Sequence, residues 1–208
     1  MGYNKMTEKT PKGYNPYDLM SALQKFIRRS MEREALFCFY ELEAHGLYHL
    51  AKSRLNIIVY EDVGIANPGL LNSINSHIEK MDKWYKLKNG AWRLVLGNII
   101  LSACRGNKTR IADYFVCSVA AEIANGYKVN FNKHNFVFDM HTRKGKQMGR
   151  GSDHFYNEAA KIIESNITTD YREAEIESFR IAKEKGLDVF EDYRKSDKKE
   201  PLQGEINF

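Results

Sequence analysis

Residues 54–68, RLNIIVYEDVGIANP, decide how the chain folds. An apolar helical run ends there in two adjacent carboxylates, Glu61 and Asp62. Gly64 can adopt the left-handed conformation that stops a helix, and the Asn-Pro pair at the end fits an N-cap and a first helical position. The stretch therefore predicts a helix end, a tight connection and a second helix. Carboxylates at a helix C-terminus face the negative end of its dipole, so both are expected to have cationic partners.

Adjacent side chains on a helix point about 100° apart, so these two carboxylates cannot flank one substrate bond without an unusual turn. We expect a structural role instead. One carboxylate is predicted to accept hydrogen bonds from the backbone of the next helix start, and the other to pair with Arg28 or Arg54. Three further cations, Lys25, Arg29 and Lys52, are expected to pair with acids of the same bundle.

Outward from this stretch, apolar residues recur three and four apart from Pro16 onward, which is typical of helices. Short connections favour antiparallel neighbours. Ser30 is a candidate N-cap for the second helix, which is expected over residues 31–44. Further helices are expected over residues 47–60, 68–84, 91–104 and 109–125. We predict an all-α bundle of about six to seven helices.

The pattern changes at Tyr127. Residues 129–131 and 136–138 alternate and favour short extended pieces. A basic loop, residues 139–151, precedes a helix from Ser152 to about Ser165 and a charged amphipathic helix. The predicted plan has three parts: a flexible N-terminus at residues 1–15, a helical domain at 16–165, and a charged helix with a flexible tail at 166–208.

Composition excludes several classes of protein. The chain has 208 residues, 43% of them hydrophobic, which is ample for one packed domain. Its apolar runs are too short for a membrane span, and its N-terminus resembles neither a secretion signal nor a myristoylation site. Its three cysteines are widely spaced in apolar helical contexts, which indicates buried thiols in a reducing, cytoplasmic setting rather than a zinc site. A net charge of +5 permits nucleic-acid binding without requiring it.

The basic loop has no acid between His141 and Gly151. Its cations are Arg143, Lys144, Lys146 and Arg150. They can clamp phosphates, with His141 and Phe155 as stacking faces for single-stranded bases. The other interpretation is a solvated connection whose cations neutralise acids on a neighbouring subunit.

Other candidate sites carry weaker signals. Asp139, His141 and His154, with Asp153 nearby, are residue types that a metal-dependent nuclease uses, although their spacing is not diagnostic. His45 and His49 are four apart but lack the glutamate of a zincin motif. Trp84, Tyr85 and Trp92 flank a lysine-rich turn and are expected to pack the core or a subunit interface rather than to bind nucleic acid.

The chain resembles the C-terminal region of the MgsA/RarA family of AAA+ ATPases, the replication-associated recombination proteins. The matching blocks are residues 17–30, 35–36, 51–54, 61–68 and 103–107, and the block that ends in Pro68 is the most specific. In that family the region is an all-helical oligomerisation domain related to the collar of clamp loaders. The resemblance implies a homo-tetramer, a role beside DNA, and no cofactor. A further target that it suggests for the basic loop is the acidic tail of single-strand-binding protein.

The chain departs from the family in three respects. It has no phosphate-binding loop, Arg29 stands where the family has glycine, and nothing after Ser165 has a counterpart. We therefore expect a non-catalytic oligomerisation and interaction module of DNA replication, recombination or repair. The initiator methionine favours a complete protein over a fragment. The competing classes are a nucleic-acid enzyme using Asp139, His141 and His154, and a phage-encoded collar mimic that binds a host replication ATPase.

Overall fold

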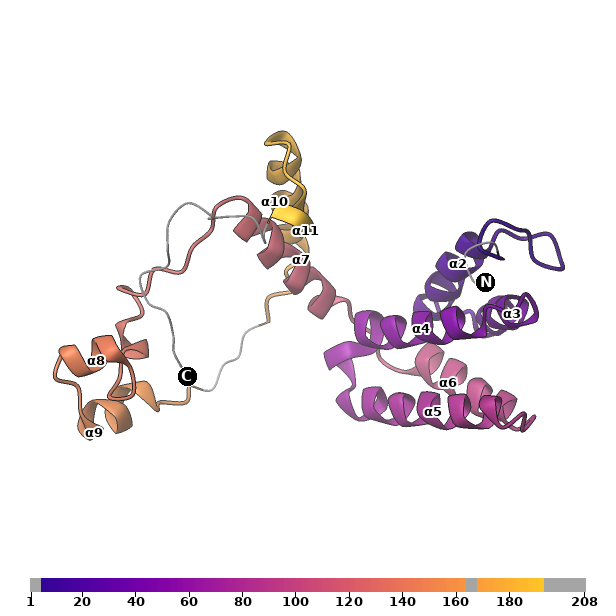
Figure 1. Cartoon of the computed structure of the whole chain (residues 1–208), viewed down its shortest axis with the longest axis horizontal. Helices are drawn as coiled ribbons and strands as arrows, with labels where there is room; N and C mark the ends of the chain where they lie inside the picture. Colours follow the sequence, from indigo (N-terminus) through magenta and orange to yellow (C-terminus); the bar gives the residue numbers. More distant parts are fainter. Residues whose placement is uncertain (1–4, 164–167, 193–208) are drawn as a thin grey trace. The chain divides into compact units, whose positions relative to one another are not determined.

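The computed structural model describes residues 5–163 and 168–192 (Figure 1). Within these residues every regular element is helical and none is a strand, which confirms the all-α prediction. The chain divides into two compact units at a point inside the expected 16–165 domain, unit 1 up to Val116 and unit 2 from Cys117. No helix of the described residues is long and apolar enough to cross a membrane.

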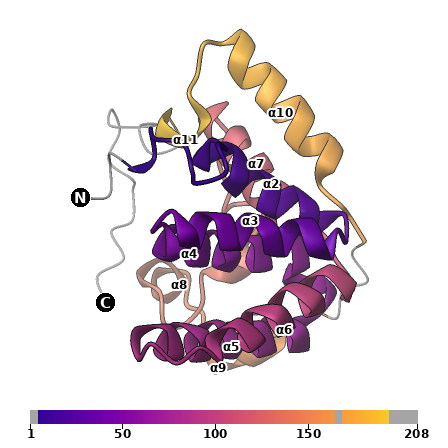
Figure 2. The ribbon, with the colours of Figure 1, turned by 90° about the vertical axis from the view of Figure 1, so that its right-hand side faces the viewer.

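Unit 1 is a bundle built from helical hairpins. Its elements are α2 (Pro16–Arg28), α3 (Glu32–Ala44), α4 (Tyr48–Ile58), the π-helical turn η1 (Val59–Val63), the 3-10 turn η2 (Gly64–Ala66), α5 (Pro68–Lys86) and α6 (Trp92–Arg105). The closest packing joins α2 to α3 and α5 to α6, while η1 and η2 form the corner between α4 and α5 (Figures 1 and 2). The expected helix boundaries therefore hold within a few residues.

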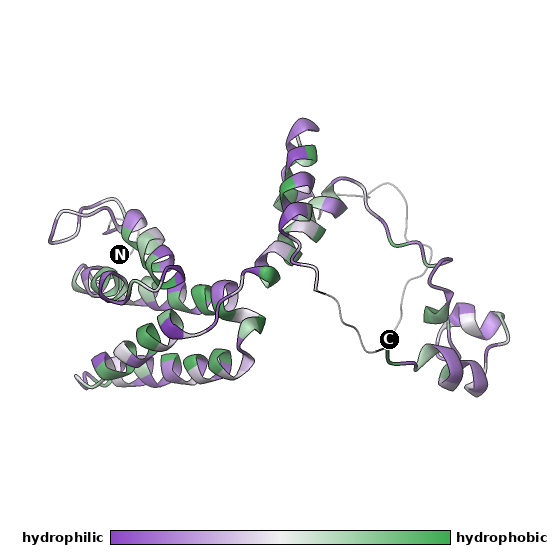
Figure 3. Cartoon of the chain, turned by 180° about the vertical axis from the view of Figure 1, so that it is seen from behind, coloured by the Kyte–Doolittle hydropathy of each residue, from purple (hydrophilic) through white to green (hydrophobic). Residues whose placement is uncertain are grey.

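One hydrophobic core fills unit 1 because each helix turns an apolar stripe inward. Figure 3 shows hydrophobic and hydrophilic residues interleaved along these helices. Fully buried side chains come from five helices and include Leu23, Phe39, Leu55, Ile74 and Leu96. Each contributes roughly 1.5–3 kcal/mol by leaving water.

Asparagine side chains cap two of these helices. The Asn15 side chain accepts the backbone N–H of Tyr17 at 2.9 Å at the start of α2. The Asn67 side chain accepts the N–H of Leu70 at 3.0 Å, with proline at the next position, as predicted for the start of α5. This cap fixes the direction in which the chain leaves the carboxylate pair.

Ser30 was expected to cap α3, and this prediction is wrong because Met31 occupies the N-cap position. Ser30 adopts φ +60° in the turn, and its hydroxyl donates to the carbonyl oxygen of Cys104 at 2.6 Å. Lys108 donates to the same carbonyl oxygen at 2.5 Å and to the Ser30 hydroxyl at 3.1 Å. The serine therefore joins the α2–α3 turn to the C-terminal end of α6.

Unit 2 has a small core of its own. It contains the C-terminal half of α7 (Ile111–Ala124), with α10 (Arg172–Glu184) and α11 (Val189–Asp192). Ala121, Ala182 and Val189 are its buried apolar residues among those described. The charged helix expected within residues 166–208 is present as α10. The end of the chain, where a flexible tail is expected, lies outside the described residues.

Residues 127–163 differ from the expectation in detail. No strand forms at 129–131 or 136–138. Residues 129 and 130 have no regular structure, a turn begins at Phe131, and the 3-10 turn η3 (Asn135–Val137) covers most of the second stretch. The basic loop contains a short helix, α8 (Arg143–Gln147), which Thr142 caps. The helix predicted from Ser152 to Ser165 is shorter, because α9 (Ser152–His154) passes into the π-helical turn η4 (Phe155–Ala159).

Candidate functional site

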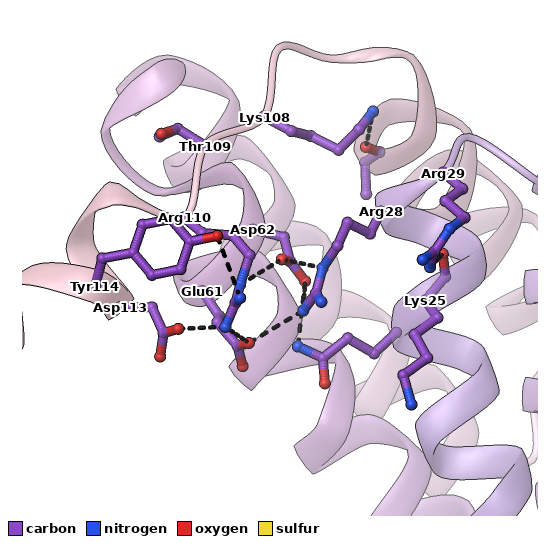
Figure 4. Close-up of polar contacts among 12 residues, drawn as sticks. Lys25, Arg28, Arg29, Glu61, Asp62, Lys108, Thr109, Arg110, Asp113 and Tyr114 are labelled. Atoms are coloured by element: carbon purple, nitrogen blue, oxygen red, sulfur yellow. Dashed lines mark hydrogen bonds and ion pairs between the residues drawn. The ribbon is translucent and has the colours of Figure 1, made fainter. Parts of the chain in front are cut away.

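The two carboxylates at the α4–α5 corner lie in one network of arginines (Figure 4). Glu61 and Asp62 sit in η1, whose turn is wider than that of an α-helix. Asp62 is fully buried, whereas the side chain of Glu61 is 20% exposed. Gly64 ends the turn at φ +44° and ψ −132°, a conformation essentially confined to glycine.

Arg28, at the end of α2, contacts both carboxylates. Its Nε donates to Asp62 Oδ1 at 2.7 Å, and its terminal nitrogen donates to Glu61 Oε1 at 3.1 Å. Gln24, one turn earlier on the same helix, donates to Asp62 Oδ2 at 3.2 Å. The predicted pairing with Arg28 is therefore present, and α2 is joined to the corner through its own C-terminal turn.

Arg110 is the second cation of the network, and the sequence analysis missed it. It donates to Glu61 Oε1 at 3.0 Å, its Nε lies 3.7 Å from Asp62 Oδ1, and it also pairs with Asp113. A cation just before the first turn of α7 faces the positive end of a helix dipole, and that disfavoured position was the signal for an acidic partner. The backbone N–H of Thr109 also donates to the Asp62 carbonyl oxygen at 2.8 Å.

Arg28 satisfies the prediction of a pair with Arg28 or Arg54, whereas the predicted contact with the backbone of the next helix is wrong. In the described residues Arg54 makes no ion pair with either carboxylate, and its buried Nε has no hydrogen-bond partner. Neither carboxylate accepts from the backbone of α5, because the Asn67 side chain already caps that helix. Both acids instead bind guanidinium groups from sequence-distant parts of the chain, the end of α2 and the residue before α7.

Electrostatics within the network are uneven. Burial, followed by the charges of Glu61 and Asp62, raises the pKa of Asp113 despite the opposing effect of Arg110. Burial lowers the pKa of Arg110, but Asp113, Tyr114 and Glu61 outweigh it and the pKa is raised overall. Three acids, Glu61, Asp62 and Asp113, therefore lie close together, and Arg28 and Arg110 offset the repulsion between them. We call these five residues the lock, because their contacts suit a structural role.

Two cations of the basic loop contact other residues of the loop region, and two do not. Arg150 donates to the carbonyl oxygens of Asn135 and, at 2.7 Å, Phe138, and Lys144 lies 4.1 Å from the centre of the Phe138 ring. Arg143 and Lys146 are exposed and form no ion pair within the described residues. These two remain the candidates for contact with an anionic partner.

The two rings predicted to be stacking faces contact each other. The rings of His141 and Phe155 meet edge to face, with centroids 5.2 Å apart. The Asp139 side chain takes part in a turn, where its Oδ1 accepts the backbone N–H of His141 at 3.0 Å. Within the described residues, Asp139, His141 and His154 do not bring three ligand atoms within metal-binding distance of one another.

The remaining candidates make contacts within unit 1. Trp92 is buried, and Tyr85 stacks on Tyr48 with ring centroids 3.4 Å apart. Lys52, as predicted, pairs with an acid of the bundle, Asp82, at 2.9 Å. His45 Nε2 contacts the carbonyl oxygen of Lys5 rather than a second histidine.

All three cysteines were expected to be buried; Cys38 and Cys104 are, whereas Cys117 is only partly buried. Burial raises the pKa of the Cys38 and Cys104 thiols to about 11, so both stay protonated at neutral pH. A protonated, enclosed thiol is a poor nucleophile. These residues therefore serve the core.

Fold and site together define a class: a helical bundle closed by a carboxylate–arginine lock, with no sheet in the part of the chain that the structure describes. Replication-associated recombination protein A of Bacillus subtilis (strain 168) is 31% identical to this chain over 141 residues. The match covers 67% of this chain and 32% of the relative, so the chain spans about a third of the relative's length. The chain is therefore related to the replication-associated recombination proteins. No family model matches it.

Proposed function

We propose that this chain is a non-catalytic assembly module of DNA replication, recombination or repair, equivalent to the collar-like C-terminal domain of the replication-associated recombination proteins. The observation that carries the proposal is the 141-residue similarity to a protein named for that process. It rests also on the lock, because Glu61, Asp62, Gly64 and Pro68 belong to the most specific block of the resemblance.

The surface of unit 1 supports assembly. Large apolar side chains remain exposed on several of its elements, among them Tyr17, Ile57, Ile65, Leu94 and Leu101. Apolar surface left on a packed bundle favours a protein–protein contact. The proposed state is the homo-tetramer that the resemblance implies, and catalysis is left to a partner.

The charge of the basic loop supports contact with an anionic partner, which we propose to be DNA. Arg143 and Lys146 offer charges that no acid of the described residues neutralises. Neutralising a phosphate releases counterions, so such binding weakens as salt rises. The acidic tail of single-strand-binding protein is the other anionic partner to be tested.

Light scattering of the purified chain, with and without single-stranded DNA, tests both parts. We expect an oligomer alone and salt-sensitive binding of labelled DNA measured by fluorescence anisotropy. Arg143→Ala with Lys146→Ala should weaken binding and lower the salt slope by about one per lost phosphate contact. Lys9→Ala with Lys83→Ala removes two exposed cations elsewhere and is the matched control.

The outcomes separate the two parts of the proposal. A chain that stays monomeric at tens of micromolar removes the assembly role. Binding that is absent, or equally reduced by the control pair, removes the DNA role of the basic loop. Capture of an acidic tail peptide in place of DNA assigns the loop to a protein partner.

A further inference from the structure

A basic cavity of about 460 Å³ lies in unit 1, where the end of α5, the turn into α6 and the first turn of α4 meet. We call it the α5–α6 cavity. Tyr85 and Trp92 form its aromatic wall. None of the described residues that line it is acidic, and four are basic: His49, Lys86, Lys88 and Arg93. Cavities that bind small ligands measure about 300–1,000 Å³, so this one has a suitable size.

The positive charge of this cavity is only partly neutralised. Lys86 pairs with Asp82 at 2.7 Å, whereas neither Lys88 nor Arg93 makes an ion pair within the part of the chain that the structure describes. Both of these side chains are exposed. The Arg93 guanidinium lies 4.6 Å from the centre of the Trp92 ring, which holds it beside the aromatic wall. The cavity therefore offers two cations that no described acid neutralises.

Lys88 occupies a backbone position that favours glycine. It follows the end of α5 at φ +54°, and its N–H donates to the carbonyl oxygen of Tyr85 at 2.9 Å. Helices commonly end in this way with glycine at the left-handed residue, because other side chains are strained there. Ser30, the other non-glycine residue with this conformation in the described part of unit 1, uses its side chain for a hydrogen bond to Cys104. The Lys88 ammonium group has no such partner among the described residues, so the strain points to a ligand.

The aromatic wall is held firmly by its neighbours. Tyr85 stacks on Tyr48 with ring centroids 3.4 Å apart, and Trp92 meets Tyr85 edge to face at 5.3 Å. The parts of these rings that line the cavity give a ligand an apolar surface to pack against. A cavity with aromatic side chains on one side and cations beside them suits a ligand that joins a flat ring to an anion.

We propose that the α5–α6 cavity binds a nucleotide, with the phosphate between Lys88 and Arg93 and the base against the aromatic wall. The planar fork of a guanidinium matches the oxygens of a phosphate, and a lysine ammonium adds a point charge. An inorganic phosphate ion has no ring to pack against the wall. A free nucleotide and the phosphorylated end of a DNA strand present the same chemistry. The site uses none of the residues of the basic loop, so it does not depend on the proposed function.

Titration calorimetry of the full chain with adenosine monophosphate, inorganic phosphate and a short oligonucleotide that carries a terminal phosphate tests the site. We expect at least one nucleotide ligand to bind more tightly than inorganic phosphate, because only a nucleotide reaches the aromatic wall. Lys88→Gly should weaken that binding about tenfold or more, since it removes a charged hydrogen-bond partner. The same substitution should not lower the urea unfolding midpoint, because glycine relieves the left-handed strain. Loss of binding in this variant therefore cannot result from unfolding.

Lys83→Ala is the matched control, since it removes an exposed cation of α5 that does not line the cavity, and it should bind as the wild type does. The oligonucleotide is titrated into Arg143→Ala with Lys146→Ala, which removes the contribution of the basic loop.

Binding of adenosine monophosphate alone supports a site for a free nucleotide, and binding of the phosphorylated oligonucleotide alone supports a site for a strand end. Absence of binding at about 1 mM of either ligand overturns the site. Equal losses in Lys88→Gly and Lys83→Ala, or inorganic phosphate that binds as tightly as both nucleotide ligands, also overturn it. Each of these failures leaves the assembly role and the basic loop untouched.

Discussion

Breaking the contact between Arg28 and Asp62 should cost unit 1 a large part of its stability. Asp62 is fully buried, and removing one partner of a buried ion pair typically costs about 3–5 kcal/mol. The Arg28 side chain is 29% exposed and keeps Glu61 as an acceptor, so we expect about 3 kcal/mol for Asp62→Ala. Arg28→Ala should cost a similar amount, because it leaves the buried carboxylate with Gln24 and a more distant Arg110.

The assay is a double-mutant cycle read by tryptophan fluorescence during urea unfolding. Both tryptophans of the chain, Trp84 and Trp92, lie in unit 1, so the signal reports this unit alone. We expect the double variant to lose less than the sum of the single losses, with a coupling energy of about 1–3 kcal/mol. The exposed pair Glu32–Arg105 is the control, and its cycle should show a smaller coupling, of at most about 1 kcal/mol.

Additivity of the two losses within about 0.5 kcal/mol would refute a direct pair. A second cycle, Arg110→Ala with Asp62→Ala, should give a weaker coupling, because the closest approach of Arg110 to Asp62 is 3.7 Å. Equal couplings would show that the two arginines hold the acid equally, against the geometry.

Three further predictions concern other features of unit 1. Gly64→Ala should destabilise unit 1 by about 1–3 kcal/mol in urea unfolding, because alanine is strained at this backbone conformation; no loss would contradict the positive φ. In a thiol titration with a chromogenic disulfide at neutral pH, Cys38 and Cys104 should react only on unfolding, and rapid reaction of all thiols would refute their burial. Burial raises the pKa of Asp82, but Lys86 and Lys52 outweigh it and hold the pKa below the usual 3.8. The stabilisation is therefore present above pH 3.8 and is lost as pH falls through the lower pKa of the folded state. If the urea midpoint of Asp82→Asn fell with pH in acid as steeply as that of the wild type, this assignment would be contradicted.

Local signals in the sequence were sufficient for the helices of unit 1. The start of α5 at Asn67–Pro68 and the helix stop at Gly64 depend on the backbone preferences of those residue types, which can be read directly from the sequence. Ser30 had the residue type of a cap but serves a tertiary contact with Cys104, which no local pattern contains. The residue type was therefore informative about hydrogen bonding and misleading about its partner.

The lock was only half predictable for a related reason. Arg28 and Arg54 were equal candidates by charge, and only packing determines which of them reaches the corner. Arg110 is 48 residues beyond Asp62, and only the tertiary fold brings the two together. At residues 129–131 and 136–138, alternation favoured short extended pieces, but the described residues contain no strand with which such a piece could pair.

The position of Arg110 decides where the chain can be cut. The irregular segment at residues 106–108, between α6 and α7, looks like a natural place to cut the chain. A piece ending there would nevertheless leave Asp62 without its second guanidinium and without the Thr109 amide. A piece that retains Tyr114, whose hydroxyl also contacts Arg110, keeps every member of the lock. The first turn of α7 is thus the minimum that the N-terminal bundle must carry when it is expressed by itself.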